Sequence, residues 1–170
     1  MEQRRLRPDE KRRVFDGRLI SVDVERWGEN EREIVHHPGA VAILAVEADG
    51  YVTFVRQLRE PARRHLLELP AGTCEPDEEP LATAKRELEE EAGLTGGDWT
   101  LAATFFSTPG FCDELVRVYV AEDVEPTERA EQDDEEIELV RVSVDELEAL
   151  VPQIEDAKTL AGLLLYRRAR

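Results

Sequence analysis

Hydrophobic residues in the first part of the chain recur with the spacing that is typical of β-strands. Residues 18–27 and 31–37 alternate hydrophobic and polar positions, and the turn sequence Gly-Glu-Asn between them predicts a β-hairpin. Residues 40–47 are continuously hydrophobic, which is typical of a strand that is buried on both faces. An Asp-Gly turn separates this central strand from another at 51–57, so this part of the chain predicts a β-sheet.

The pattern changes from strand to helix at Pro80. The predicted helix begins after Glu79 and ends at Gly93, and one of its faces carries four hydrophobic residues: Leu81, Ala84, Leu88 and Ala92. Further strands are predicted at 66–72, 99–106, 115–121 and 137–143. The C-terminus predicts a short helix after Ser143 and a longer one from about Glu155. This order of elements predicts an α/β (α+β) sandwich with a mixed sheet and few helices.

The charge balance limits the partners of this protein. Its 170 residues suffice for one domain with a continuous core, and its formal net charge is −17 at pH 7. Such an acidic protein repels phosphate backbones and anionic lipid headgroups, so we expect no nucleic acid and no membrane among its partners. The charged start of the chain does not read as a signal peptide, and we expect a cytoplasmic protein in which Cys74 and Cys112 are free thiols.

Acidic residues are concentrated at the end of the predicted helix, although like charges at this spacing repel. With about 100° between successive residues, Glu87, Glu90 and Glu91 share one face, while Glu89 points elsewhere. Carboxylate oxygens are preferred ligands of Mg²⁺, and a bound cation would turn the repulsion into coordination. The alternative is a solvated acidic face that is braced by ion pairs such as Arg86 with Glu90.

The residues around this cluster complete a longer motif. In chain order it contains Gly72, five residues, Glu78, seven residues, Arg86-Glu87-Leu88, one residue, Glu90-Glu91, one residue and Gly93-Leu94. Through these 23 residues (72–94) the chain resembles the Nudix hydrolases, which split nucleoside diphosphates linked to another moiety. The resemblance implies a Nudix-type α/β/α sandwich, with an N-terminal hairpin region at 1–37 and a Nudix hydrolase domain at 38–170.

The resemblance also implies roles for the residues of the motif. It implies four ligands of Mg²⁺, or alternatively of Mn²⁺: the backbone carbonyl of Ala71 and the carboxylates of Glu87, Glu90 and Glu91. Arg86 would hold the glutamate side chains in place, and Gly72 would let the backbone come close to the metal and the phosphates. Glu78 is expected to be a structural or outer-shell partner.

Residues outside the motif resemble the ADP-ribose pyrophosphatase group of this family. The flanking sequences are "EREIVHHPGAVAIL", "VRQLREP" and "LLELPAG", and Pro109 follows Gly93 by sixteen residues as in that group. The resemblance implies Mg²⁺-dependent hydrolysis of ADP-ribose to AMP and ribose 5-phosphate. One alternative is another sugar nucleotide such as GDP-mannose, and another is a Nudix module that binds nucleotides without cleaving them. The motif contains the full set of candidate metal ligands, which favours the enzyme over the module that only binds.

An acidic protein needs local cationic and aromatic side chains to bind a nucleotide. Arg56 and Arg59 are candidate contacts to the diphosphate or the terminal ribose, and surface ion pairing is the alternative for each. Arg32, in "REIV", resembles the residue that stacks on adenine in this group. The N-terminal hairpin is exchanged in a homodimer in the group, so a homodimer is implied. Trp27 offers another stacking face, although packing is the commoner role of a tryptophan near a hairpin end.

The implied mechanism is metal-assisted attack of water on phosphorus, with a general base that removes the proton. In the group the base is a glutamate on a loop beyond the motif. Here the acidic connection offers four candidates: Asp133, Asp134, Glu135 and Glu136. We choose Glu135 because it stands two residues before the strand that begins at Ile137, where an acid of this loop stands in the group. The other three acids stay open, and Glu90 is the alternative within the motif.

Overall fold

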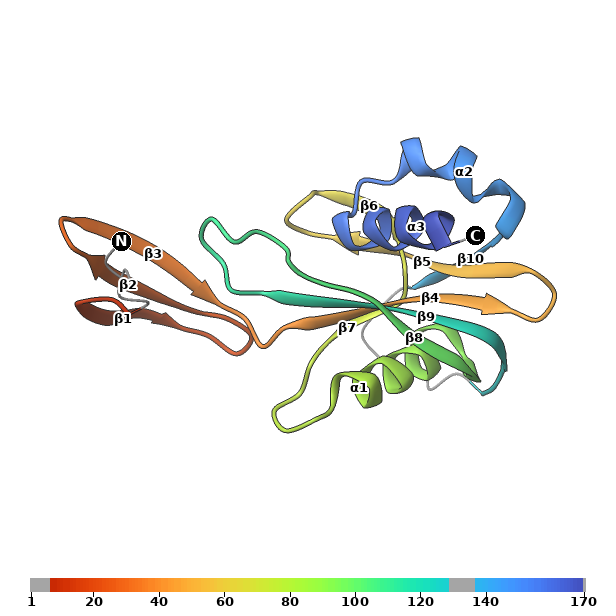
Figure 1. Ribbon diagram of the computed structural model, residues 1–170, viewed down its shortest axis with the longest axis horizontal. Helices are drawn as coiled ribbons and strands as arrows, with labels where there is room; N and C mark the ends of the chain where they lie inside the picture. Colours follow the sequence, from red (N-terminus) through yellow and green to blue (C-terminus); the bar gives the residue numbers. More distant parts are fainter. Residues whose placement is uncertain (1–6, 129–136, 170) are drawn as a thin grey trace.

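The computed structural model describes residues 7–128 and 137–169, which form two β-sheets with helices packed on the larger one (Figure 1). The small antiparallel sheet contains β1 (Glu10–Asp16), β2 (Ser21–Trp27) and β3 (Asn30–His36). The larger sheet has the order β10-β5-β4-β9-β8, and two short strands pair at its centre, β6 with β5 and β7 with β4. Its strands are β4 (Ala40–Glu47), β5 (Tyr51–Arg59), β6 (Arg64–Glu68), β7 (Ala71–Thr73), β8 (Leu94–Phe106), β9 (Leu115–Pro126) and β10 (Glu138–Ser143). The helical segments are α1 (Pro80–Glu87), η1 (Leu88–Ala92), η2 (Val144–Glu146), α2 (Leu147–Leu150), η3 (Val151–Gln153) and α3 (Ala157–Ala169).

The larger sheet is mixed, as the sequence predicts. β4 runs parallel to β9, whereas its pairings with β5 and β7 are antiparallel. Every residue from Ala40 to Val46 is buried, so the continuous hydrophobic run is the central strand. The predicted hairpin is also confirmed, because β2 and β3 pair from Ser21 and His36 to Trp27 and Asn30.

Two hydrophobic clusters cover the two faces of this sheet. On one face, Ala84 of α1 and Leu88 of η1 pack against Ile43 of β4. On the other face, Leu163 of α3 packs against Leu44 of β4. Because successive side chains of a strand point to opposite faces, the neighbours Ile43 and Leu44 belong to different clusters. The result is a sheet between two helical layers, as Figure 1 shows.

The strand predicted at 66–72 is two strands, because the chain changes partner at Leu69 and Pro70. Pro70 has no N–H to donate, and the N–H of Leu69 donates to the Thr159 hydroxyl of α3 at 2.8 Å. β6 therefore pairs with β5, and β7 pairs with β4. The strands β4 and β5 pair directly where Val46 lies opposite Val52. Away from this pair, β4 takes β7 as its partner and β5 takes β6.

The hydrophobic pattern does not predict β1, whose residues are all exposed. Charged side chains join this strand to β2 instead. Arg13 lies opposite Asp23 in the ladder and forms an ion pair with it, and Lys11 pairs with the same carboxylate at 2.6 Å. A strand that is held by cross-strand charges has no alternation of hydrophobic residues for a sequence pattern to detect.

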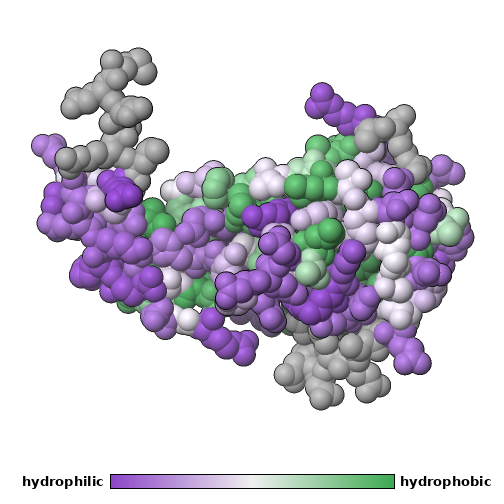
Figure 2. Space-filling view, turned by 60° about the horizontal axis from the view of Figure 1, so that its bottom comes forward, coloured by the Kyte–Doolittle hydropathy of each residue, from purple (hydrophilic) through white to green (hydrophobic). Residues whose placement is uncertain are grey.

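The small sheet projects from the body that carries α1, and hydrophilic residues cover most of its surface in the view of Figure 2. Within residues 7–128 and 137–169, no helix is long and apolar enough to cross a membrane. Cys74 and Cys112 are both free thiols, as predicted.

Candidate active site

The acidic motif lies where α1 gives way to a π-helical turn. The helix changes type at Leu88 and ends at Gly93, whose φ of +63° is in the left-handed region that glycine adopts readily. Glu91 is buried within this turn, whereas Glu89 is exposed and accepts a hydrogen bond from Thr95 at 2.6 Å. The prediction that Glu89 points away from the other glutamates is therefore confirmed. Single π-helical turns of this kind occur frequently at functional sites.

Gly72 of β7 lies directly against the Glu87 carboxylate. A Cβ atom at position 72 would lie 1.9 Å from Cδ of Glu87 and 2.1 Å from its Oε1. No side chain fits there, so glycine is what allows β7 and the end of α1 to approach this closely. Sequence reasoning anticipates a close backbone approach at this position, and the structure shows that the nearest group is Glu87 itself.

The residue before this glycine holds a second glutamate. The N–H of Ala71 donates to Oε2 of Glu91 at 2.9 Å, and Glu91 is only 5% exposed. Two adjacent backbone positions therefore fix two carboxylates of the motif. Ala71 fixes Glu91 by a hydrogen bond, and Gly72 accommodates Glu87 by having no side chain.

Arg86 is the cation at the centre of the motif. Its Nη1 lies 2.9 Å from Oε1 of Glu87 and 2.9 Å from Oε2 of Glu90. Its Nε and Nη2 donate to the Glu78 carboxylate at 3.3 and 3.2 Å. Glu78 is itself held by the Thr83 hydroxyl, which donates to it at 2.8 Å. Glu78 and Thr83 thus orient the guanidinium that lies between the two glutamates.

Burial and the Arg86 charge act in opposite directions on the Glu87 carboxylate. Burial raises the pKa of Glu87, and the neighbouring Arg86 opposes this rise only in part. The pKa of Arg86 is raised, chiefly by its hydrogen bond to Glu78 and further by the charge of Glu87. The neutral form of Glu87 is therefore favoured relative to a carboxyl group in water. A divalent cation beside it would favour the ionised form.

The strand β5 brings one of the two candidate arginines toward the motif. Arg59 forms a bidentate pair with the buried Glu68, at 2.7 and 2.8 Å. The pKa of Arg59 is raised, chiefly by this hydrogen bond and further by Glu91, so its guanidinium lies within electrostatic reach of the motif. Arg56 lies three positions earlier and therefore points to the opposite face of β5, where it approaches Glu138 at 3.8 Å.

Two of the other candidate residues lie in the small sheet, away from the motif within one chain. β2 carries Trp27 and β3 carries Arg32, and both strands belong to the sheet that projects from the body in Figure 1. Pro109 lies in an exposed turn between β8 and β9. The four acids considered as the general base lie outside the described residues: Asp133, Asp134, Glu135 and Glu136.

The turn between β8 and β9 connects the small sheet to the body. Val35 donates its N–H to the Phe111 carbonyl at 2.8 Å and accepts from the Asp113 N–H at 3.1 Å. His36 bridges two carboxylates, with Nδ1 2.6 Å from Asp113 and Nε2 2.7 Å from Asp23. Sequence reasoning did not single out His36, because its two partners are distant in the chain.

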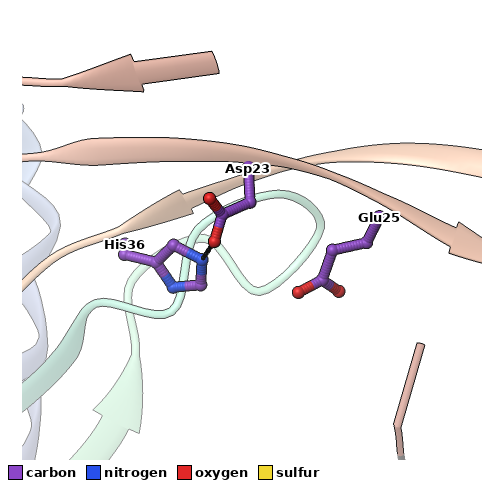
Figure 3. A group of neighbouring side chains, drawn as sticks. All are labelled: Asp23, Glu25 and His36. Carbon is purple, nitrogen blue, oxygen red and sulfur yellow. Dashed lines mark hydrogen bonds and ion pairs between the residues drawn. The ribbon is translucent and has the colours of Figure 1, made fainter. Parts of the chain in front are cut away.

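Asp23, Glu25 and His36 form a compact group in the small sheet, and their ligand-type atoms lie within 4.8 Å of one another (Figure 3). The Asp23 side chain is fully buried between Lys11 and Arg13, and hydrogen bonds from Arg13 and Lys11 hold its pKa well below the usual range. Two cations thus already compensate Asp23. We interpret the group as a charge network that braces the small sheet.

Comparison with known proteins decides the family. The NUDIX domain family matches residues 35–163, which is most of the chain. The chain belongs to the Nudix family. Nudix hydrolases typically use a divalent metal ion. The acidic motif of this Nudix protein lies within the matched residues.

Individual relatives of this Nudix protein cover nearly its full length. It is 41% identical over 158 residues to the ADP-ribose pyrophosphatase of Bacillus subtilis (strain 168), which covers 88% of this chain and 85% of the relative. It is 35% identical over 159 residues to the methanol dehydrogenase activator of Bacillus methanolicus, covering 88% and 86%. The crystal structure of an ADP compounds hydrolase superimposes with a TM-score of 0.81 at 22% identity, covering 96% of this chain and 94% of that one. This last likeness confirms the predicted fold.

The contact between Gly72 and Glu87 predicts that Gly72→Ala displaces the Glu87 carboxylate. We expect the variant to lose most of the rise in Tm that Mg²⁺ gives the wild type, because an ion that binds the folded state stabilises it by mass action. Thermal unfolding with and without Mg²⁺ measures this loss. Gly110→Ala is the matched control, since nothing lies within 4 Å of its Cβ position. An unchanged metal response in Gly72→Ala would contradict the prediction.

Proposed function

We propose that this Nudix protein hydrolyses ADP-ribose to AMP and ribose 5-phosphate with the help of Mg²⁺. The observation that carries the proposal is the complete acidic motif, in which Arg86 lies between Glu87 and Glu90 while the backbone of Ala71 holds Glu91. The Bacillus subtilis relative, which is named as an ADP-ribose pyrophosphatase, supports ADP-ribose in particular.

The donor set of the motif fits Mg²⁺, a hard cation that prefers oxygen ligands. Four oxygen donors are proposed to hold it: the carbonyl of Ala71 and the carboxylates of Glu87, Glu90 and Glu91. Mn²⁺ would accept the same donors. The close approach of Gly72 to the Glu87 carboxylate, where a Cβ atom would overlap Cδ of Glu87, brings the backbone of β7 next to these donors and supports a site at this place. A divalent cation would compensate charges that Arg86 compensates only in part.

The residues of the chain then have distinct tasks. A Mg²⁺ ion held by these donors would supply Lewis-acid chemistry, namely polarisation of phosphoryl oxygens and activation of water. Arg86 keeps Glu87 and Glu90 oriented, and Arg59 binds a phosphoryl oxygen or the terminal ribose. Glu135 accepts the proton of the attacking water, a role that rests on its position in the sequence, and Glu90 is the alternative base. Arg56 is the weaker of the two arginine candidates because it points to the other face of β5.

The adenine site is proposed to form in a homodimer, with Arg32 of the small sheet stacking on the base. Arg32 is exposed, and Trp27 is 37% exposed, so both offer a free face for stacking. The small sheet projects away from α1 within one chain (Figure 1), which supports its exchange with a second copy. Residues 1–37 would then be the exchanged region beside a catalytic domain at 38–170, and Pro109 lies in the turn that connects the two.

Two other functions stay candidates. Another sugar nucleotide such as GDP-mannose would use the same motif, because the metal and the diphosphate are common to both substrates. The Bacillus methanolicus relative is named as an activator of another enzyme, which favours a regulatory Nudix protein as the second class. The net charge of −17 disfavours nucleic acid and anionic membranes as partners. The proposed location is the cytoplasm.

A panel of nucleotide sugars assayed with Mg²⁺ tests the function. We expect ADP-ribose to give AMP and ribose 5-phosphate with a higher kcat/KM than GDP-mannose. Glu87→Gln should lower kcat at least about 10²-fold, the cost typical of losing one electrostatic stabiliser of the transition state. Glu89→Gln is the matched control because Glu89 is exposed and points away from the motif. If GDP-mannose is hydrolysed in preference, the proposal of ADP-ribose as the substrate is wrong. If no sugar nucleotide is hydrolysed, the proposal of an enzyme is wrong.

The assignment of the general base is tested within the acidic connection. Glu135→Gln should lower kcat by about 10²- to 10⁴-fold and leave substrate and metal affinity nearly intact, as expected of a residue that only accepts a proton. Asp133→Asn, Asp134→Asn and Glu136→Gln are its controls in the same assay. A large loss at one of these neighbours would make the choice of Glu135 wrong, and no loss at any of the four would point to Glu90.

The homodimer is tested by light scattering together with kinetics. We expect a dimer, and we expect Arg32→Ala to raise KM with little change in kcat, because the adenine is remote from the bond that breaks. Arg12→Ala, an exposed arginine of the same small sheet, is the matched control. Deletion of residues 1–37 should remove both dimerisation and substrate affinity. A fully active wild-type monomer would contradict the proposal.

A further inference from the structure

β5 carries a buried polar side chain, that of Gln57. Gln57 is 6% exposed, and its side-chain nitrogen has no partner among residues 7–128 and 137–169. Most buried polar groups in proteins are paired, because an unpaired one costs the free energy of its lost hydration. A hydrophobic residue at position 57 would avoid this cost, so an unpaired amide here indicates a ligand that completes it.

The position of Gln57 in β5 places it beside the acidic motif. Thr53, Gln57 and Arg59 share one face of the strand because side chains alternate along it. This strand packs against η1, and Thr53 lines the same pocket as Ala92 at the end of η1. At the other end of the row, Arg59 lies within electrostatic reach of Glu91. Gln57 lies between these two points and therefore faces the region of the motif glutamates.

The protein's own acids near this row already accept hydrogen bonds. Glu68 accepts two from Arg59 and one from Lys158, and Glu91 accepts one from the Ala71 N–H. Across the ladder, Gln57 pairs with Leu66, whose side chain has no acceptor. The amide donor is thus available to an acceptor that enters with a ligand.

We propose that Gln57 binds the diphosphate of the substrate, with its side-chain N–H donating to a phosphoryl oxygen. The proposal rests on the proposed function and adds a residue to its binding site. Phosphoryl oxygens are charged acceptors, and hydrogen bonds to charged groups are stronger than those between neutral groups. A neutral amide also suits this place. A cationic side chain at position 57, a third cation beside Arg59 and Arg86, would form an ion pair with Glu91, whereas an amide would not.

Gln57→Met tests the proposal, since methionine keeps the length of the side chain and removes the donor. We expect Tm without ligand to stay the same or rise, because an unpaired buried amide is lost. We expect kcat/KM to fall about 10- to 100-fold, and the affinity for ADP in calorimetry to fall by a similar factor. Gln153→Met is the matched control, because Gln153 is exposed and far along the chain in η3, and neither quantity should change.

A second variant separates substrate binding from metal binding. Gln57→Glu places a carboxylate where we propose a phosphoryl oxygen, so it should weaken ADP binding more than Gln57→Met does. The Mg²⁺-induced rise in Tm should persist in both variants. A lower Tm and a lost metal response, with ADP affinity unchanged, would show that Gln57 is structural and overturn the proposal. ADP binding decides this even if the wild type hydrolyses no ADP-ribose, so the two proposals fail separately.

Discussion

The approach of the backbone at Ala71 and Gly72 to two glutamates is the constraint on which the rest of the site depends. It requires β7 to lie on β4 directly beneath the junction of α1 and η1. The chain reaches this place because it leaves β5 at Pro70, where no N–H is available to continue the earlier ladder. A short break in a strand therefore creates the contact that positions Glu87 and Glu91.

The concentration of negative charge is tolerated because it is organised around Arg86. Glu78 and Thr83 orient the guanidinium, which leaves it between Glu87 and Glu90. This compensation is incomplete, since burial still raises the pKa of Glu87. A cation beside Glu87 would favour its ionised form and so lower this pKa.

Most of the fold and the location of the site follow from the sequence, because hydrophobic periodicity and motif spacing are local properties. The run at 40–47 predicts β4, and the spacing from Gly72 to Gly93 predicts the acidic cluster. The features that the sequence does not predict depend on partners elsewhere in the chain. β1 is held by charges on β2, and the lack of a partner for the Gln57 amide nitrogen among the described residues becomes visible only when its surroundings are known. The general base stays a prediction because its residues lie outside the described part of the chain.

Side chains alternate between the two faces of β5, which explains why one strand serves both the core and the site. Phe54 points to the face that packs under α3, whereas Gln57 and Arg59 point to the face of the motif. Beyond Val52, β5 pairs with β6 in place of β4. The two polar residues therefore project toward the motif without disturbing the core on the other face. A one-residue shift of β5 would exchange Arg59 with Leu58 and remove the cation from the site.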